Sequence, residues 1–182
     1  MFARTERLML RPGWPEDAPV LSRAIGDEAV VRNLARAPWP YALGDAQAFL
    51  SATPDRLLPN FLIFARTQGA PRLVGGIGLH RDDHGAVELG YWIARPYWGL
   101  GFATEAGRAV VDLAQESLRL DRLVAGHFLD NPASGHVLRK LGFVATGQMT
   151  TRASQARGCL VPFVAFELSS TTVEGVMPRL AA

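Results

Sequence analysis

A glycine-rich turn between a strand and a helix carries the clearest chemistry in this chain. Residues 97–106 read Y-W-G-L-G-F-A-T-E-A, and they follow a strand-like alternation, V-E-L-G-Y-W-I, at 87–93. Gly99 and Gly101 tolerate backbone angles that other residues avoid, and they let a ligand approach the main chain closely. The first turn of a helix leaves N–H groups without acceptors at the positive end of the helix dipole. We therefore expect this turn to bind a phosphate or a pyrophosphate.

Two common phosphate motifs do not fit this turn. A P-loop needs G-x-x-x-x-G-K-[ST], but the single lysine of the chain is Lys140, far away in sequence. A dinucleotide fingerprint needs G-x-G-x-x-G and an acidic residue about 20 positions later. Asp121 lies near that distance, but Thr104 occupies the position of the third glycine. An ordinary tight turn before a helix is the remaining alternative.

The turn resembles the acetyl-CoA-binding motif of the GNAT acetyltransferases, [QR]-x-x-G-x-[GA]. The match falls at Gly101 and Ala103, and the first position departs from it because it is Trp98. The longer string is similar to the RimJ/RimL-like branch of that family, in which Y-W-G-x-G-[YF]-A-T-E-A is common. An aromatic-proline segment at 38–50, P-W-P-Y-A-L-G-D-A-Q-A-F-L, also resembles that branch.

A second motif supports the same resemblance. Residues 130–143, D-N-P-A-S-G-H-V-L-R-K-L-G-F, are similar to the family element N-x-x-S-x-x-V-L-x-K-L-G-F, and they follow the first motif in the expected order. The resemblance spans residues 5–168. It implies the GNAT fold, an α/β domain with a mixed, mostly antiparallel sheet flanked by helices. In that fold the fourth and fifth strands splay apart and admit the pantetheine arm of acetyl-CoA.

The resemblance also implies an enzyme, an N-acetyltransferase. It would transfer acetyl from acetyl-CoA, as co-substrate, to a primary amine by direct attack in a ternary complex. An α-amine with a pKa of about 7.7–8.0 is neutral at pH 7 far more often than a lysine of about 10.4, so a modest base suits a protein N-terminus. A small-molecule amine (polyamine, amino acid or antibiotic) remains open as acceptor. A non-catalytic acetyl-CoA-binding regulatory module remains open as well.

Glu88 is the candidate general base. The period of a strand places Glu88 on the same face as Trp92 and opposite Leu89 and Tyr91. Partial burial in so apolar a strand would raise the pKa of its carboxyl toward the range of a useful base. The family often has a glutamate here, which acts directly or through a water. The alternative is a partly exposed glutamate paired with an arginine of a neighbouring strand.

Ser134 is the candidate that assists the leaving thiolate. Asn131 and Ser134 lie at the start of a predicted helix, where Asn131 is also a good N-cap. The resemblance places Asn131 beside the pantetheine arm and Ser134 near the thiol, as a hydrogen-bond donor or as a general acid. Many relatives outside this branch use a tyrosine of this helix as the acid. That position is Leu138 here, which excludes a tyrosine acid at this site.

The remaining cofactor contacts are main-chain groups. The turn should direct its N–H groups at the pyrophosphate, from Leu100, Gly101, Phe102, Ala103 and Thr104. By resemblance, an added-strand pairing with the pantetheine should use Trp92, Ile93 and Ala94. Arg139 and Lys140 would meet the 3′-phosphate or face solvent.

Several other polar or aromatic residues have weaker signals. We expect no metal at the turn that holds His80, Asp82, Asp83 and His84, because Asp and Gly are ordinary turn residues. His127 is expected in the core or lining the site, and His136 in solvent. We expect three aromatic side chains to line the acceptor pocket or to pack in the core, namely Trp14, Trp39 and Tyr41.

The expected elements position these residues within one α/β domain. Predicted helices cover 15–25, 27–35, 44–52, 101–117 and 132–141. Predicted strands cover 7–11, 60–67, 72–80, 87–93, 122–129, 143–149 and 161–168. A chain of 182 residues favours a single domain. We place it at 1–170, with 171–182 as a loose tail.

Composition narrows the possible partners. The formal net charge is +2 and the arginines are scattered, which argues against nucleic acid. The chain has no apolar run long enough to span a membrane, and charged residues interrupt the region where a signal peptide needs its apolar stretch. Cys159 is the single cysteine, so no internal disulfide can form. These features predict a cytoplasmic protein, which would be a monomer or a homodimer.

Overall fold

The computed structural model describes residues 1–52, 55 and 57–169, and its centre is a mixed sheet. The described sheet has eight strands in the order β1-β2-β3-β4-β5-β6-β8-β7. All neighbours pair antiparallel except β5 and β6, which are parallel. The strands are β1 (Ala3–Arg4), β2 (Leu8–Arg11), β3 (Asn60–Ala65), β4 (Arg72–Arg81), β5 (Val87–Ile93), β6 (Arg122–Phe128), β7 (Val144–Ser154) and β8 (Cys159–Ser169). The predicted mixed α/β fold is confirmed.

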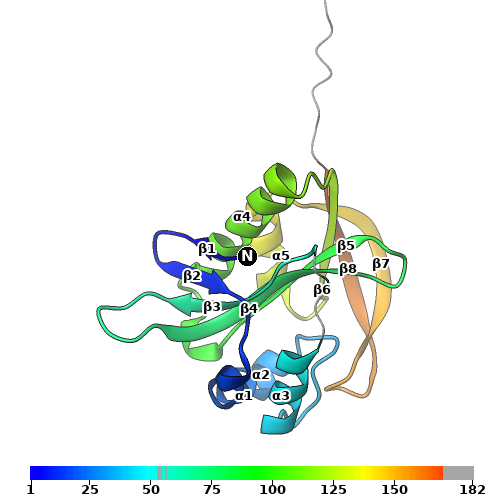
Figure 1. The fold of residues 1–182 in the computed structure, drawn as a ribbon. Coiled ribbons are helices and arrows are strands. Elements are labelled where there is room, and N and C mark those ends of the chain that lie inside the picture. Colours follow the sequence, from blue (N-terminus) through cyan, green and yellow to red (C-terminus); the bar gives the residue numbers. More distant parts are fainter. Residues whose placement is uncertain (53–54, 56, 170–182) are drawn as a thin grey trace, which may run out of the picture.

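Helices cover both faces of the sheet (Figure 1). One face carries α1 (Ala18–Ile25), α2 (Glu28–Val31) and α3 (Leu43–Ser51), and the other carries α4 (Phe102–Asp112) and α5 (Pro132–Lys140). The apolar stripe of α4 is buried in the main core, at Ala106 and Val110. None of the described helices has both the length and the apolar character needed to cross a membrane.

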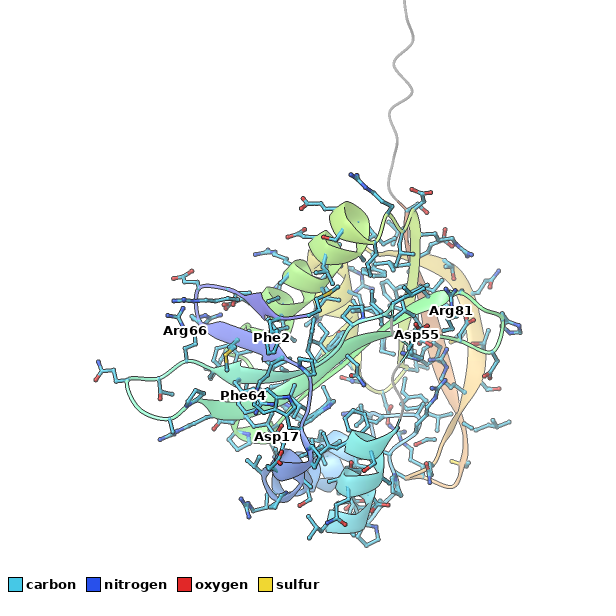
Figure 2. The ribbon with its side chains drawn as sticks, viewed as in Figure 1. Phe2, Asp17, Asp55, Phe64, Arg66 and Arg81 are labelled. Atoms are coloured by element: carbon cyan, nitrogen blue, oxygen red, sulfur yellow. The ribbon has the colours of Figure 1, made fainter. Side chains whose placement is uncertain are left out.

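A buried ion pair links β2 to the 3-10 turn, Pro15–Asp17, that precedes α1. Arg11 of β2 donates two hydrogen bonds of 2.7 Å to the carboxylate of Asp17, and its guanidinium stacks on the rings of Trp14 and Phe64. Figure 2 shows Asp17 and Phe64 on the α1 side of the sheet. This pairing and stacking account for the burial of both charged groups.

The fourth and fifth predicted strands are β5 and β6, because β1 was not predicted, and their parallel pairing is confined to one point. Glu88 and Val124 are the register pair that joins them, whereas the whole of β5 pairs with β4, from Gly75↔Ile93 to Arg81↔Val87. The N–H of Ala94 donates to Val74 of β4 at 2.8 Å. Because main-chain groups alternate in direction along a strand, those of Ile93 and Tyr91 face away from β4, toward the side of β6.

The glycine turn that precedes α4 has the predicted backbone. Gly99 and Gly101 have φ of 76° and 81°, a region that residues with a Cβ rarely adopt. The N–H of Glu105 donates to the carbonyl of Gly101 at 3.0 Å. The amides of the three residues before Glu105 therefore have no acceptor within the helix.

Element boundaries depart from the expectation at several places. β1 was not predicted, and the predicted helix at 15–25 is a 3-10 turn, Pro15–Asp17, followed by α1. The second predicted helix covers four residues as α2, because the side chain of Asn33 donates to the carbonyl of Ala29 at 2.8 Å and competes with the helical bond. The predicted helix at 101–117 is α4 followed by a π-helical turn, Leu113–Ser117. The final hairpin, β7 and β8, is longer than predicted. The predicted tail at 171–182 lies outside the described residues.

Candidate active site

The predicted site residues converge on one large cavity. Its volume is about 2080 Å³, and its lining includes Glu88, Gly101, Ser134 and Arg152. Ligand pockets for small molecules usually measure about 300–1,000 Å³. The cavity therefore has room for a large ligand and a second, smaller one.

The start of α4 and the C-terminal half of β5 form one side of this cavity. Most of the predicted cofactor contacts line it, namely Trp92, Ile93, Gly101, Phe102, Ala103, Thr104, Asn131 and Ser134. Ala94 and Leu100 are not part of the lining. Ala94 is buried, and its N–H is already bonded to Val74 within the sheet.

Trp98 explains the departure at the first position of the turn motif. Its indole N–H donates to the carbonyl of Ile93 at 2.6 Å, which ties the turn back onto β5. The carbonyl of Ile93, which we expected to pair with a ligand, therefore already has a donor. The N–H of Ile93 and the main chain of Tyr91 remain directed toward the β6 side.

Arg7 and Thr5 form hydrogen bonds that support the turn, and the sequence did not predict them. We call this set of contacts the brace. Arg7 donates from Nη1 to the carbonyl of Leu100 at 3.0 Å and from Nε to Glu105 of α4 at 2.7 Å. Thr5 donates its hydroxyl to the same carboxylate at 2.6 Å. Burial raises the pKa of Glu105, but hydrogen bonds from Thr5 and Arg7 and the arginine charge outweigh it and lower that pKa. No local pattern reveals this brace, because Arg7 and Glu105 are 98 positions apart.

Glu88 lines the cavity between the side chains of His80 and Arg152. It is 5% exposed. Its Oε2 is 3.4 Å from Nε2 of His80, which is its register partner on β4. Its Oε1 accepts a hydrogen bond from Arg152 of β7, whose guanidinium stacks on Phe163 at 4.1 Å. Three strands thus contribute to one charged cluster.

The pKa of Glu88 differs in direction from the expectation. Burial raises the pKa of its carboxyl, as predicted, but hydrogen bonds and charges from His80 and Arg152 outweigh burial, so the pKa lies below 4.5. The prediction of a raised pKa is therefore wrong, because the alternation of β5 did not reveal the two partners. The arginine partner comes from β7, which β6 and β8 separate from β5, and not from a neighbouring strand.

Ser134 meets a tyrosine that the sequence had not singled out. The hydroxyl of Tyr91 lies 2.7 Å from Oγ of Ser134 and donates to its carbonyl at 3.1 Å. Burial raises the pKa of Tyr91 to about 12, which keeps its proton in place at neutral pH. The alternation of β5 had placed Tyr91 on the apolar face, and that face is the one that α5 covers. Leu138 is fully buried in the core.

The weaker candidates lie in varied surroundings. His127 is buried, with Nδ1 2.8 Å from the carbonyl of Phe128, and His136 is exposed. Tyr41 lines the cavity, whereas Trp14 and Trp39 are not part of its lining. Asp82 accepts from two main-chain N–H groups of its own turn. Among the residues that the structure describes, no group of three His, Cys, Asp or Glu side chains is arranged to hold a metal.

Comparison with known proteins identifies the class to which this fold and cavity belong. Residues 7–144 match the family model described as the acetyltransferase (GNAT) domain. This match covers more than half of the chain, so the protein belongs to the GNAT acetyltransferase family. The RimJ/RimL-like resemblance has support at low identity.

Individual relatives agree with this assignment over most of the chain. The uncharacterized N-acetyltransferase p20 of Bacillus licheniformis is 29% identical over 168 residues, which cover 90% of this chain and 93% of that protein. A GNAT-family acetyltransferase from Bacillus anthracis has a similar fold, with a TM-score of 0.78 at 21% identity over 93% of this chain and 98% of that one. RimL, a ribosomal L7/L12 alpha-N-protein acetyltransferase solved with coenzyme A, has a TM-score of 0.75 at 18% identity, with the same coverage.

Proposed function

We propose that this protein transfers an acetyl group from acetyl-CoA to a primary amine in a ternary complex. The observation that supports this most directly is that the start of α4, Glu88 and Ser134 all line one cavity. Family membership supplies the reaction class. A non-catalytic binding module would need the amides at the start of α4, but it would not need Glu88 or Ser134 in the same space.

The chain's own groups fit the parts of acetyl-CoA. The amides of Phe102, Ala103 and Thr104 suit the pyrophosphate, and the positive end of the α4 dipole adds to them. The N–H of Ile93 and the main chain of Tyr91 suit the pantetheine arm, which would extend β5 on the side where β6 diverges. Asn131 and Ser134 lie at the start of α5, where they line the same cavity.

Ser134 would assist the departure of the thiolate. Tyr91 supports Ser134 in this role, because its hydroxyl lies within hydrogen-bonding distance of Oγ of Ser134. Tyr91 has one hydroxyl hydrogen, which reaches either the carbonyl or Oγ of Ser134. When Tyr91 donates to Oγ, the hydroxyl hydrogen of Ser134 is free to point at a sulfur atom in the cavity. A positioned donor of this kind stabilises negative charge as it develops in the transition state.

For the acceptor, we propose an α-amine of a peptide or protein. An α-amine is neutral at pH 7 in a larger fraction of molecules than a lysine side chain is, so it makes a smaller demand on the base. The named activity of RimL, on ribosomal L7/L12, is of this kind. A small-molecule amine, such as a polyamine, an amino acid or an antibiotic, is the second candidate, because the cavity is large enough to hold one beside acetyl-CoA.

The proposal is tested first by binding and then by transfer. We expect acetyl-CoA to raise the melting temperature by an amount that grows with its concentration, since a ligand of the native state stabilises it by mass action. NADH and ATP serve as matched nucleotide controls and should give no comparable rise. A flat melting temperature with acetyl-CoA would contradict the proposal.

The transfer assay then separates the acceptor classes. Thiol release is followed with N-terminal peptides of ribosomal proteins, polyamines, aminoglycosides and free amino acids. We expect the fastest release with a peptide α-amine. Binding of acetyl-CoA without release of thiol to any amine would favour the regulatory module.

A further inference from the structure

The charged cluster around Glu88 leaves a question about proton transfer. An amine acceptor enters as an ammonium ion and must lose a proton before it attacks a thioester. Glu88 is held ionised by Arg152 and His80, and a carboxylate with a lowered pKa accepts that proton poorly. The inference below rests on the proposed function, and it concerns which group is the base.

His80 has the geometry that Glu88 lacks. Both residues belong to the same register pair of β4 and β5, so their side chains are on one face of the sheet, and both line the cavity. The His80 side chain is 39% exposed and that of Glu88 is 7% exposed. Of the two side chains, that of His80 is therefore the more accessible to an acceptor.

The two ring nitrogens of His80 have different surroundings. Nε2 is 3.4 Å from the carboxylate of Glu88. A Cβ at Gly90 would lie 3.4 Å from Cε1 and 3.8 Å from Nδ1 of His80. Because Gly90 has no side chain and lines the cavity, it leaves room beside this edge of the ring.

We propose that His80 is the general base of the transfer and that Glu88 is its positioning residue. A carboxylate can only accept hydrogen bonds, so the nitrogen facing Glu88 carries the ring proton and Nδ1 keeps its lone pair. The carboxylate also stabilises the imidazolium that forms when Nδ1 takes up a proton. This is the relation of base and orienting carboxylate known from other catalytic triads. Arg152 keeps Glu88 ionised.

The protons balance over the reaction. The acceptor ammonium gives one proton to Nδ1, and the neutral nitrogen attacks the thioester carbonyl carbon. The C–N bond forms, the C–S bond breaks, and the second nitrogen proton is transferred to the departing sulfur by way of the Ser134 hydroxyl. His80 then releases its proton to solvent, because its side chain is partly exposed.

Other titratable groups near His80 are less suitable. The carboxylate of Asp82 already accepts hydrogen bonds from two N–H groups of its own turn. Asp83 and His84 belong to the same turn and also line the cavity. Burial raises the pKa of Tyr41 to about 12, which removes it as a base at neutral pH. Two charged side chains from neighbouring elements lie near His80. Glu88 of β5 faces it directly, and Arg152 of β7 binds the other oxygen of Glu88.

The test is the pH dependence of acetyl transfer to the best acceptor of the thiol-release screen. His80→Gln should lower kcat/KM for the amine by about 10²–10⁴-fold near pH 7, as for loss of a general base. The loss should shrink as the pH approaches the pKa of the acceptor, because solvent then supplies the neutral amine. Glu88→Gln should move the midpoint of the low-pH limb to lower pH, since the imidazolium loses its anionic partner. The control is Arg108→Gln, an exposed residue of α4 that is not part of the cavity lining, and it should retain the wild-type profile.

The outcomes separate the two proposals. Each variant is first shown to keep the rise in melting temperature with acetyl-CoA, which establishes that it is folded and binds the donor. Unchanged turnover of His80→Gln, or a loss that is the same at every pH, would overturn the role of His80 and leave the transferase intact. A wild-type protein that neither binds acetyl-CoA nor releases thiol would instead overturn the proposed function itself, and the role of His80 with it.

Discussion

At the scale of single residues, Ser134 and Tyr91 form a hydrogen-bonded pair of hydroxyl groups. Their hydroxyl oxygens lie 2.7 Å apart, and Tyr91 reaches them from β5 while Ser134 belongs to α5. The sequence singled out Ser134 through its motif. It left Tyr91 unassigned, because a tyrosine in an apolar strand is usually a core residue and the 43 positions between the two hide their contact.

This pair leads to a prediction on turnover. Ser134→Ala should lower kcat by about 10²-fold, as expected for loss of one donor to a developing anion, while KM for acetyl-CoA stays close to the wild-type value. Tyr91→Phe keeps the ring and removes only the hydroxyl, so it should lower kcat by less. In the double variant the losses should not multiply, because both changes disrupt one hydrogen-bond chain.

The measurement is steady-state kinetics of all four proteins in a double-mutant cycle. Multiplicative losses would mean that Tyr91 and Ser134 act separately. Unaltered kcat in Ser134→Ala would remove that hydroxyl from the reaction.

At the scale of elements, the glycine turn depends on support from another part of the chain. The strand, the turn and the helix start are local features, and each was predicted from glycine positions and periodicity within about 30 residues. The brace from Arg7 was not predictable in this way. It is formed because β2 lies beside the start of α4 in the folded chain, and it neutralises Glu105, an acidic residue close to the proposed pyrophosphate.

Removal of this brace should weaken binding of the pyrophosphate in particular. Arg7→Met keeps the aliphatic stem but loses the charge and the hydrogen bond to Leu100. We expect KM for acetyl-CoA to rise by about 10-fold, the equivalent of one charge-assisted hydrogen bond. KM for S-acetylpantetheine, which has no pyrophosphate, should be unchanged.

The matched control is Arg108→Met, which changes an exposed arginine on α4 itself. An equal rise in KM for both donors would show that Arg7 acts on the fold of the site as a whole. No rise for either donor would show that the turn needs no support from Arg7.

At the scale of the whole molecule, two carboxylates of the described residues, Asp17 and Glu88, are buried and paired. Burial raises the pKa of Asp17, but its bonds to Arg11 and to the N–H of Trp14 bring it below 3.8. The carboxyl of Glu88 likewise has a pKa below 4.5. Both groups therefore bind protons more readily when the chain is unfolded, so they add stability above their ordinary pKa values, and that stability is lost as the pH falls through the folded values.

Acid should accordingly destabilise this protein. We expect the free energy of unfolding, measured with urea, to be highest near neutral pH and to fall below about pH 4.5. Asp17→Asn should be less stable at neutral pH and should show a shallower dependence on acid. A wild-type stability that is constant or increases on acidification would contradict the pairing of these carboxylates.

The sequence by itself determined the features that short stretches of chain encode. These are the turn with two positive-φ glycines, the alternation of β5, the start of α5 at Asn131, and the mixed α/β fold that their motifs imply. Their physical basis is local, because backbone sterics, hydrogen-bond geometry and side-chain period act over a few residues.

Only the tertiary structure decided which charges and hydroxyls meet. Arg152 reaches Glu88 across 64 positions, and Arg7 reaches Glu105 across 98. Such contacts depend on how the strands are ordered and how the hairpin of β7 and β8 is placed, and no local pattern specifies these. For that reason the direction of the Glu88 pKa could not be predicted from its apolar strand, since the sign depends on partners that the fold brings from elsewhere.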